Sequence, residues 1–344
     1  MAIIVGTLAN EILKGSNRET NFVFGDFEGQ LFQQTPGNDA VIGGNKSENH
    51  LFGDAGGLQE ATGGNDIIVG GNNSLNFVWG DAGQMTNAIG GNDIITGGKN
   101  SENHLSGDGE RMDALPRSSS TGGNDLIIGG DNSENFACGD AEDIFFSRGG
   151  NDTIIGGRNS TNTLSGDAGG FNVGCTGGND LLIGGAKSTN LIYGDAGWLN
   201  NGIGGDDTLI GGMGGVNYMY GEGHTITATD AGDDRLISAA RTTDHMWGDA
   251  QITDSVSLLG EDTFVFSPHN GCDYVHDFHQ GQDIIELSGF SRRRLASFSD
   301  LDIKTIDTDG DHVADSSLIQ FDHANNITVY GVTLLTEADF QFFV

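Results

Sequence analysis

The sequence predicts an all-β fold: a parallel β-solenoid, of the β-roll or β-helix kind, with about nine coils of 27 residues and a β-rich C-terminal cap. Three observations support this prediction. Two short signatures recur in register along the chain. Each signature contains a short segment with an apolar residue at its centre. Glycine is abundant and proline is rare, with 58 glycines and 3 prolines among 344 residues.

The first signature is Gly-Asn-Asp, or Gly-Asp-Asp later in the chain, followed by an apolar triplet and usually by Gly-Gly. Its aspartates are mostly 27 residues apart, as from Asp39 to Asp66 (66 − 39 = 27). One longer step follows Asp93 and holds an insertion at residues 111–120, which we expect to be a surface loop. The aspartates of this first row are Asp39, Asp66, Asp93, Asp125, Asp152, Asp180, Asp207 and Asp234.

The second signature is Asn-x-x-x-Gly-Asp, usually followed by Ala, and it keeps the register of the first. Glu222 occupies one of its acidic positions. The aspartates of this second row are Asp26, Asp54, Asp81, Asp108, Asp140, Asp167, Asp195 and Asp249.

The apolar segments predict short strands. The triplets Ile67-Ile68-Val69 and Phe77-Val78-Trp79 are typical, and the middle residue is apolar in every coil while its neighbours vary. This alternation indicates a strand whose middle side chain points inward. Such short strands are stable only when each pairs with its equivalents in the coils above and below, and glycines permit positive-φ turns between them. No window has helical spacing, so we expect almost no helix.

The coil length does not decide whether the solenoid has two or three faces. A two-sided roll needs two nonapeptides in each coil, whereas 27 residues correspond to three. Either one corner is extended, for example at residues 81–89, or the coil has a third face. We favour the two-sided roll with one elaborated edge.

The charge balance excludes some functions. The chain has 15 basic and 49 acidic residues, so its formal charge is 15 − 49 = −34. A polyanion of this kind cannot neutralise phosphates, which excludes a nucleic-acid binder and disfavours an anionic membrane surface. No apolar run approaches the ~18 residues of a membrane span. The N-terminal residues do not form a classical signal peptide. A compact polyanion repels itself, so we expect it to recruit divalent cations.

Calcium fits these residues, because it takes several carboxylate and backbone carbonyl oxygens in flexible loops. The segment Gly64-Asn65-Asp66-Ile67-Ile68-Val69 and its repeats resemble the repeats-in-toxin, or haemolysin-type, calcium-binding nonapeptide, over roughly residues 6–260. The resemblance implies a secreted protein that folds around Ca²⁺. We expect the first row to hold the stronger calcium sites and the second row weaker ones. Eight aspartates in register favour metal ligands over residues that merely cap their own turns.

The chain departs from that family in its second strand, where the motif would place an aspartate. Asparagine occupies this position in most coils, and Asp244 restores the acid in the last one. Stacked amides hydrogen-bond to each other, so we expect a ladder of asparagines. The residues of this ladder are Asn49, Asn76, Asn103, Asn135, Asn162, Asn190 and Asn217.

We divide the chain into a solenoid at residues 1–260 and a capping and secretion-signal region at residues 261–344. Segments such as Gly281-Gln282-Asp283 and the apolar end Phe342-Phe343-Val344 resemble the C-terminal cap of serralysin-type proteases and the signals of type I secretion substrates. The resemblance implies the type I secretion machinery as a partner. In addition, Asp307, Asp309, Asp311 and Asp315 have the spacing of a short calcium loop, except that His312 replaces a glycine. The alternative is a solvated acidic turn.

We expect no catalytic activity, because the His-Glu-x-x-His and Gly-x-Ser-x-Gly motifs are absent. Three function classes stay open. The first is a secreted or cell-surface protein with a structural or adhesive role, including self-association. The second is a module that binds extracellular polysaccharide, which an exposed aromatic column at Trp79, Tyr193, Tyr220 and Trp247 would favour. A solenoid lyase or epimerase ranks last.

Overall fold

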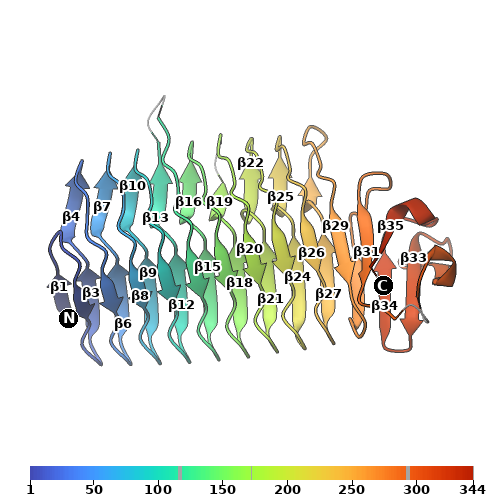
Figure 1. The fold of residues 1–344 in the computed structure, drawn as a ribbon, viewed down its shortest axis with the longest axis horizontal. Coiled ribbons are helices and arrows are strands. Elements are labelled where there is room, and N and C mark those ends of the chain that lie inside the picture. The colour runs from blue at the N-terminus through green and yellow to red at the C-terminus, as the bar shows by residue number, and fades with distance from the viewer. Residues whose placement is uncertain (115–117, 172, 292–294, 344) are drawn as a thin grey trace.

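A computed structural model describes residues 1–114, 118–171, 173–291 and 295–343. The chain winds into a parallel β-solenoid of about ten turns, which confirms the predicted fold class. Figure 1 shows the turns stacked along the long axis, with the N-terminus at one end and the cap at the other. Each turn contributes one strand to each of three sheets. The preference for a two-sided roll was therefore wrong, because the segment following the second row forms a third sheet.

The three sheets are named A, B and C, and their strands are given in spatial order. Sheet A contains β1 (Ala2–Val5), β3 (Thr20–Phe24), β6 (Glu48–Phe52), β9 (Leu75–Trp79), β12 (Glu102–Ser106), β15 (Glu134–Cys138), β18 (Thr161–Ser165), β21 (Thr189–Tyr193), β24 (Val216–Tyr220), β27 (Thr243–Trp247), β30 (Cys272–Val275), β34 (Asn325–Val329), β33 (Ser316–Asp322) and β32 (Asp302–Ile306). Sheet B contains β2 (Ile12–Lys14), β5 (Ala40–Ile42), β8 (Ile67–Val69), β11 (Ile94–Thr96), β14 (Leu126–Ile128), β17 (Thr153–Ile155), β20 (Leu181–Ile183), β23 (Thr208–Ile210), β26 (Arg235–Ile237), β29 (Thr263–Phe266), β31 (Ile284–Ser288) and β35 (Phe340–Phe343). Sheet C contains β28 (Ala250–Thr253), β25 (Gly223–Thr227), β22 (Trp198–Asn200), β19 (Ala168–Phe171), β16 (Ala141–Phe145), β13 (Gly109–Asp113), β10 (Ala82–Thr86), β7 (Ala55–Gln59) and β4 (Phe27–Phe32).

One coil runs from β8 through a turn to β9, then through the second-row aspartate to β10, and back through the first-row aspartate to β11. Pairing with the next coil is parallel and in register, so Ile68 faces Ile95 and Val78 faces Leu105. The middle residues of the triplets are fully buried, as predicted. Among the described residues, helix is limited to two short 3-10 turns, η1 (Phe298–Asp300) and η2 (Glu337–Asp339).

The interior contains two separate apolar cores. One lies between sheets A and B, where residues such as Val41 and Leu51 are fully buried, and it continues into the cap. The other lies behind sheet C and includes Leu58 and Met85. The two aspartate rows lie on the segments that leave sheet A and enter sheet B, so acidic residues separate the two cores.

The turns differ from expectation in their use of glycine. Positive φ at the corner between sheets B and A belongs mostly to other residues, such as Lys46 (φ 57°) and Asn73 (φ 55°). The glycine of the second signature is needed for a different reason, namely the close approach of successive coils. A Cβ atom on Gly80 would collide with the Gly107 carbonyl oxygen and with the Asp93 carboxylate. Glycine therefore brings adjacent coils and the carboxylate together.

The insertion begins as a strand rather than a loop. Arg111 and Asp113 belong to β13, which pairs with β10 and β16. The rest of the predicted loop includes residues 115–117, which lie outside the described residues.

At the C-terminal end of the molecule, sheet C stops at β28, whereas sheets A and B continue into the cap. There β32, β33 and β34 pair antiparallel, and β35 closes sheet B; Val344 is not described.

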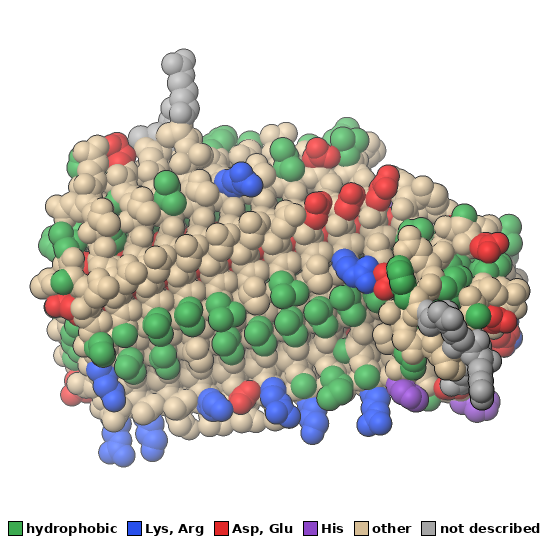
Figure 2. All heavy atoms as spheres, in the orientation of Figure 1, with side chains coloured by type: hydrophobic (Ala, Val, Ile, Leu, Met, Phe, Trp, Pro, Cys, Tyr) green, Lys and Arg blue, Asp and Glu red, His purple; other side chains and the backbone are tan. Residues whose placement is uncertain are grey.

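The outward face of sheet B is apolar. Ile67, Val69 and Ile94 are 37–50% exposed. Figure 2 shows apolar side chains gathered in a stripe along the solenoid, with Lys and Arg side chains along one edge of the molecule. Among the described residues, no helix is long and apolar enough to cross a membrane.

The predicted asparagine ladder is confirmed on the inner side of sheet A. The Asn103 carboxamide oxygen accepts hydrogen bonds from the backbone N–H of Gly98 and from Asn76 Nδ2, both at 2.8 Å. Its Nδ2 donates to the Gly98 carbonyl at 3.0 Å and to Asn135 Oδ1 at 2.8 Å. Each fully buried amide thus closes its own turn and joins two coils. The ladder ends at Asp244, whose Oδ1 accepts from Asn217.

The ladder provides a test of the fold. We expect Asn103→Ala to lower the free energy of unfolding by about 3 kcal/mol or more, because it leaves several buried polar groups without partners. The matched control is Asn92→Ala. Asn92 accepts a similar coil-to-coil hydrogen bond from the Asn124 backbone at 2.7 Å but is exposed, so we expect a loss below ~1 kcal/mol. Urea unfolding of both variants in calcium measures the difference, and equal losses would contradict a structural role for the buried ladder.

Candidate metal centre

The two aspartate rows face each other across the middle of the coil. Asp81 follows β9, and its Oδ2 accepts a hydrogen bond from the backbone N–H of Gly91 in the same coil at 2.9 Å. Asp93 precedes β11, and its backbone N–H donates to Oδ1 of Asp125 in the next coil at 2.6 Å. The second row therefore braces each coil internally, and the first row links each coil to the next. Both patterns repeat along the solenoid.

Most of these carboxylates use one oxygen in this way, and their other oxygen has no partner. Asp140, Asp167 and Asp195 instead share one backbone N–H between both oxygens. In the first row the free atom is Oδ2, as in Asp66 and Asp93, and in the second row it is usually Oδ1, as in Asp54 and Asp81. All but three of the described buried side-chain atoms without a hydrogen-bond partner belong to these two rows, with Glu222 counted in the second; the others are on Asp262, Asn270 and His279. Burying a polar atom without a partner is costly, so the pattern is typical of a cation site.

Carboxylate oxygens of the two rows converge in groups of three. Each group combines two successive second-row aspartates with the first-row aspartate between them, with the oxygen atoms within 4.8 Å of one another. Neighbouring groups share one second-row aspartate. The groups are Asp54, Asp66 and Asp81; Asp81, Asp93 and Asp108; Asp108, Asp125 and Asp140; and Asp140, Asp152 and Asp167. In these coils, carboxylates of both rows thus lie around a single line of positions.

The carboxyl groups are strongly perturbed. Burial raises the pKa of Asp81, Asp93 and Asp108 well above the ordinary value, and neighbouring carboxylates raise it further. The same burial raises the pKa of Asp26 to about 6 and that of Asp66 to about 8. Among the ion pairs of the described residues, none joins a basic side chain to a row aspartate between residues 26 and 262. In the described part of the chain, no basic side chain therefore compensates these charges by direct contact.

The available donors suit a hard divalent cation. All the side-chain atoms in these groups are carboxylate oxygens. A backbone carbonyl, that of Gly107, also lies close to the Asp93 carboxylate above Gly80. Calcium prefers such oxygen ligands in flexible number, whereas zinc prefers nitrogen and sulfur. The Asp-rich turns are thus compatible with calcium.

The structure extends both rows beyond the residues that the signatures identified. Asp262 Oδ1 accepts from the Asp234 backbone at 2.9 Å, and Asp283 Oδ1 accepts from the Asp262 backbone at 3.1 Å, so both continue the first row. Asp277 takes the second-row place two residues after β30, although it accepts its hydrogen bond from the backbone of Gly248 in the preceding coil, at 2.8 Å. The sequence signal was weak, because Glu261 replaces asparagine before Asp262 and His276 replaces glycine before Asp277.

The C-terminal acidic loop is only partly assembled as predicted. Asp307, Asp309 and Asp311 are exposed and bring their oxygens within 4.8 Å of one another. Asp315 is held elsewhere, because its Oδ1 accepts from the hydroxyls of Thr308 at 2.7 Å and Ser316 at 2.6 Å. Three of the four predicted residues therefore lie together.

These pKa shifts predict opposite pH dependences with and without calcium. In the metal-free protein the folded pKa values lie above the unfolded value of about 4. The protonated carboxyl groups therefore add to the free energy of unfolding. This contribution is complete below pH ~4, and it is lost as pH rises through about 6 for Asp26 and Asp249 and through about 8 for Asp66 and Asp277. With saturating calcium we expect stability to rise over that range, because metal binding displaces protons.

Urea unfolding followed by far-UV circular dichroism at pH 5, 6.5 and 8 gives the free energy of unfolding at each pH. Measured in calcium and in chelator-treated buffer, it gives the slope of that free energy against pH with and without the metal. Slopes of the same sign in the two buffers would contradict a metal role for the rows.

The comparisons with known proteins agree with this geometry. Residues 37–344 match the sequence model of the family described as peptidase M10 serralysin C terminal. No curated protein matches the chain. The family is the non-catalytic repeat domain of serralysin-type proteins, which are secreted. Since the match spans most of the sequence and the fold is the repeat solenoid expected of it, the chain belongs to the serralysin C-terminal family of calcium-binding repeat domains.

Proposed function

We propose that this chain is a secreted calcium-binding repeat protein whose solenoid folds when calcium binds, and which has a structural or adhesive role outside the cell or at its surface. The observation that carries the proposal is the double row of buried carboxylate oxygens without partners. Ligands that bind only the folded state stabilise it, and here the cation sites exist only when adjacent coils are stacked.

Each ion would be held by one first-row aspartate and the two second-row aspartates that flank it. Because successive groups share a second-row carboxylate, this arrangement favours one ion per coil over two. The exposed Asp307, Asp309 and Asp311 would form a separate site in the cap.

Calcium-coupled folding also supports secretion. Without cations, like charges oppose the compact state, so the chain would stay unfolded where calcium is scarce and fold where it is plentiful. This behaviour suits passage through the type I secretion machinery, and the family's membership among secreted proteins supports it.

We further propose that the chain has no catalytic activity. Its buried carboxylates repeat from coil to coil, whereas a catalytic pair would occur once, and the matching family is a non-catalytic domain. Repetition along a rigid rod instead suits a scaffold or an adhesive surface.

Calcium titration of the metal-free protein tests the proposed folding reaction. We expect a coil-like far-UV circular dichroism spectrum at pH 8 to convert cooperatively to a β spectrum with calcium and much less with magnesium, which demands near-octahedral geometry. A β spectrum that is complete in chelator and unchanged by calcium would refute the proposal.

A matched pair of variants tests the assignment of the ligands. Asp108 is shared by two carboxylate groups, so we expect Asp108→Asn to raise the calcium midpoint of folding roughly ten-fold, because ligand charge sets affinity. The control is Asp206→Asn. Asp206 is exposed, and its position is occupied by asparagine in earlier coils, such as Asn179. Equal midpoints for the two variants would contradict the assignment.

A further inference from the structure

The outward face of sheet A carries a column of side chains beside sheet C, one from the last residue of each strand. The column is aromatic at both ends, with neighbouring ring centroids 4.5–5.3 Å apart. The aromatic members are Phe24, Phe52, Trp79, Tyr193, Tyr220 and Trp247. The predicted exposed column is thus partly wrong, because Trp79 and Tyr220 are only 8% and 4% exposed. The hydroxyl of Tyr220 reaches Gln251 on β28, which places its ring between sheets A and C.

The middle of the column is different. Ser106, Cys138 and Ser165 occupy three successive positions between the aromatic ends. Between the two sheets, these small side chains leave a cavity of about 360 Å³. This volume is in the range of small-molecule sites.

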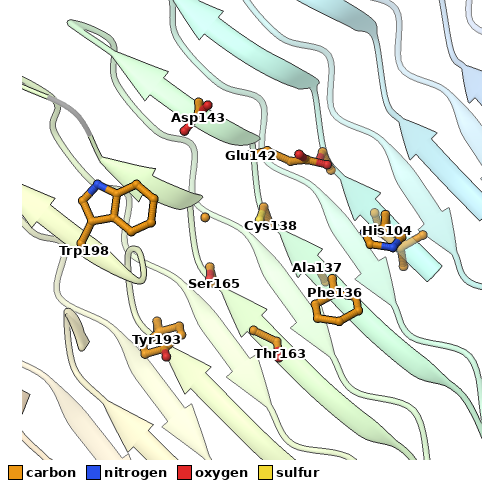
Figure 3. A pocket seen from close by; sticks show the side chains of 13 residues that line it. His104, Phe136, Ala137, Cys138, Glu142, Asp143, Thr163, Ser165, Tyr193 and Trp198 are labelled. Atoms are coloured by element: carbon orange, nitrogen blue, oxygen red, sulfur yellow. The ribbon is translucent and has the colours of Figure 1, made fainter. Parts of the chain in front are cut away.

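Aromatic side chains surround this cavity, as Figure 3 shows. Phe136 and Tyr193 line it from sheet A, and Trp198 lines it from sheet C. The indole ring of Trp198 lies across Gly170, where any side chain would collide with it. The Trp198 side chain is half exposed, so its ring is available for contact with a ligand.

The charge at the cavity is negative. Glu142 and Asp143, both on β16, line it from sheet C, and Figure 3 shows both on the same side of the opening. No Lys or Arg is among its described lining residues. The nearby Arg111 is engaged by Asp113 at 2.8 Å. The Arg111 guanidinium lies 4.3 Å from the centre of the Phe145 ring. An aromatic side chain of β16 therefore already contacts one cation.

We infer that this cavity binds a small organic cation: an ammonium or guanidinium group carried on an apolar body. Aromatic faces attract such cations, carboxylates compensate their charge, and the apolar walls bury the alkyl groups. The formal charge of −34 further concentrates cations at the surface and disfavours acidic ligands. The inference does not depend on calcium-coupled folding, since none of its residues belongs to the aspartate rows.

Isothermal titration calorimetry of the calcium-loaded full chain tests the inference. The probes are choline, its neutral isostere 3,3-dimethyl-1-butanol, and N-acetyl-arginine methylamide. We expect choline or the arginine derivative to bind at least about ten-fold more tightly than the neutral isostere, because cation–π attraction requires the charge. The inference would be overturned if neither cation bound, or if neither bound more tightly than the neutral isostere. Binding of maltotriose without binding of either cation would assign the cavity to a neutral saccharide instead.

Three variants and a control locate the binding. We expect Trp198→Ala and Glu142→Gln each to weaken cation binding at least about five-fold. Ser165→Tyr should abolish it, because the new ring would continue the stack from Tyr193 and fill the cavity. This variant should keep the wild-type circular dichroism spectrum, since stacked rings already occupy this column in other coils. Asp206→Asn, outside the cavity, should bind as the wild type does, and unchanged binding in Ser165→Tyr would overturn the inference.

Discussion

The burial of like-charged carboxylates is the constraint on which the rest of this structure depends. In each coil one aspartate follows the sheet A strand and another precedes the sheet B strand, and both point into the space between the two apolar cores. Burial disfavours the ionised form and neighbouring carboxylates add to that effect. Under the proposed calcium binding, a cation between the rows would let the carboxylates remain ionised. The proposal thereby links folding to the calcium concentration of the solvent.

The same constraint explains the repeat length and its glycines. A carboxylate can meet its counterparts only if every coil returns in register, and the nearly constant 27-residue step provides that register. The coils must also approach closely where the carboxylates lie. Gly80 shows why glycine is required there, since a Cβ atom would occupy the place of the Asp93 carboxylate.

The asparagine ladder solves a similar problem without a metal. Asn76, Asn103 and Asn135 are as deeply buried as the aspartates, yet each amide carries both a donor and an acceptor. A column of amides can therefore satisfy itself from coil to coil, whereas a column of carboxylates, which only accept hydrogen bonds, cannot. The chain thus has one ladder that is satisfied by its own hydrogen bonds and one double row of carboxylates, and under the proposed function the second makes folding depend on calcium.

The sequence by itself determined the solenoid, the inward residue of each triplet, the asparagine ladder and the first-row aspartates. These features depend on the spacing of residues along the chain. Because the repeat has a nearly constant length, equivalent residues of successive coils stack on one another. Only the tertiary structure decided that Gly83 to Thr86 belong to a third sheet, because their alternation is weak and glycine-rich. That third sheet turns the chain back, so that Asp81 and Asp93 meet. It also forms, with sheet A, the space in which Trp79 is buried and in which the small side chain of Ser106 leaves a cavity. Contacts across a coil depend on the path of the chain between strands, which residue spacing alone does not encode.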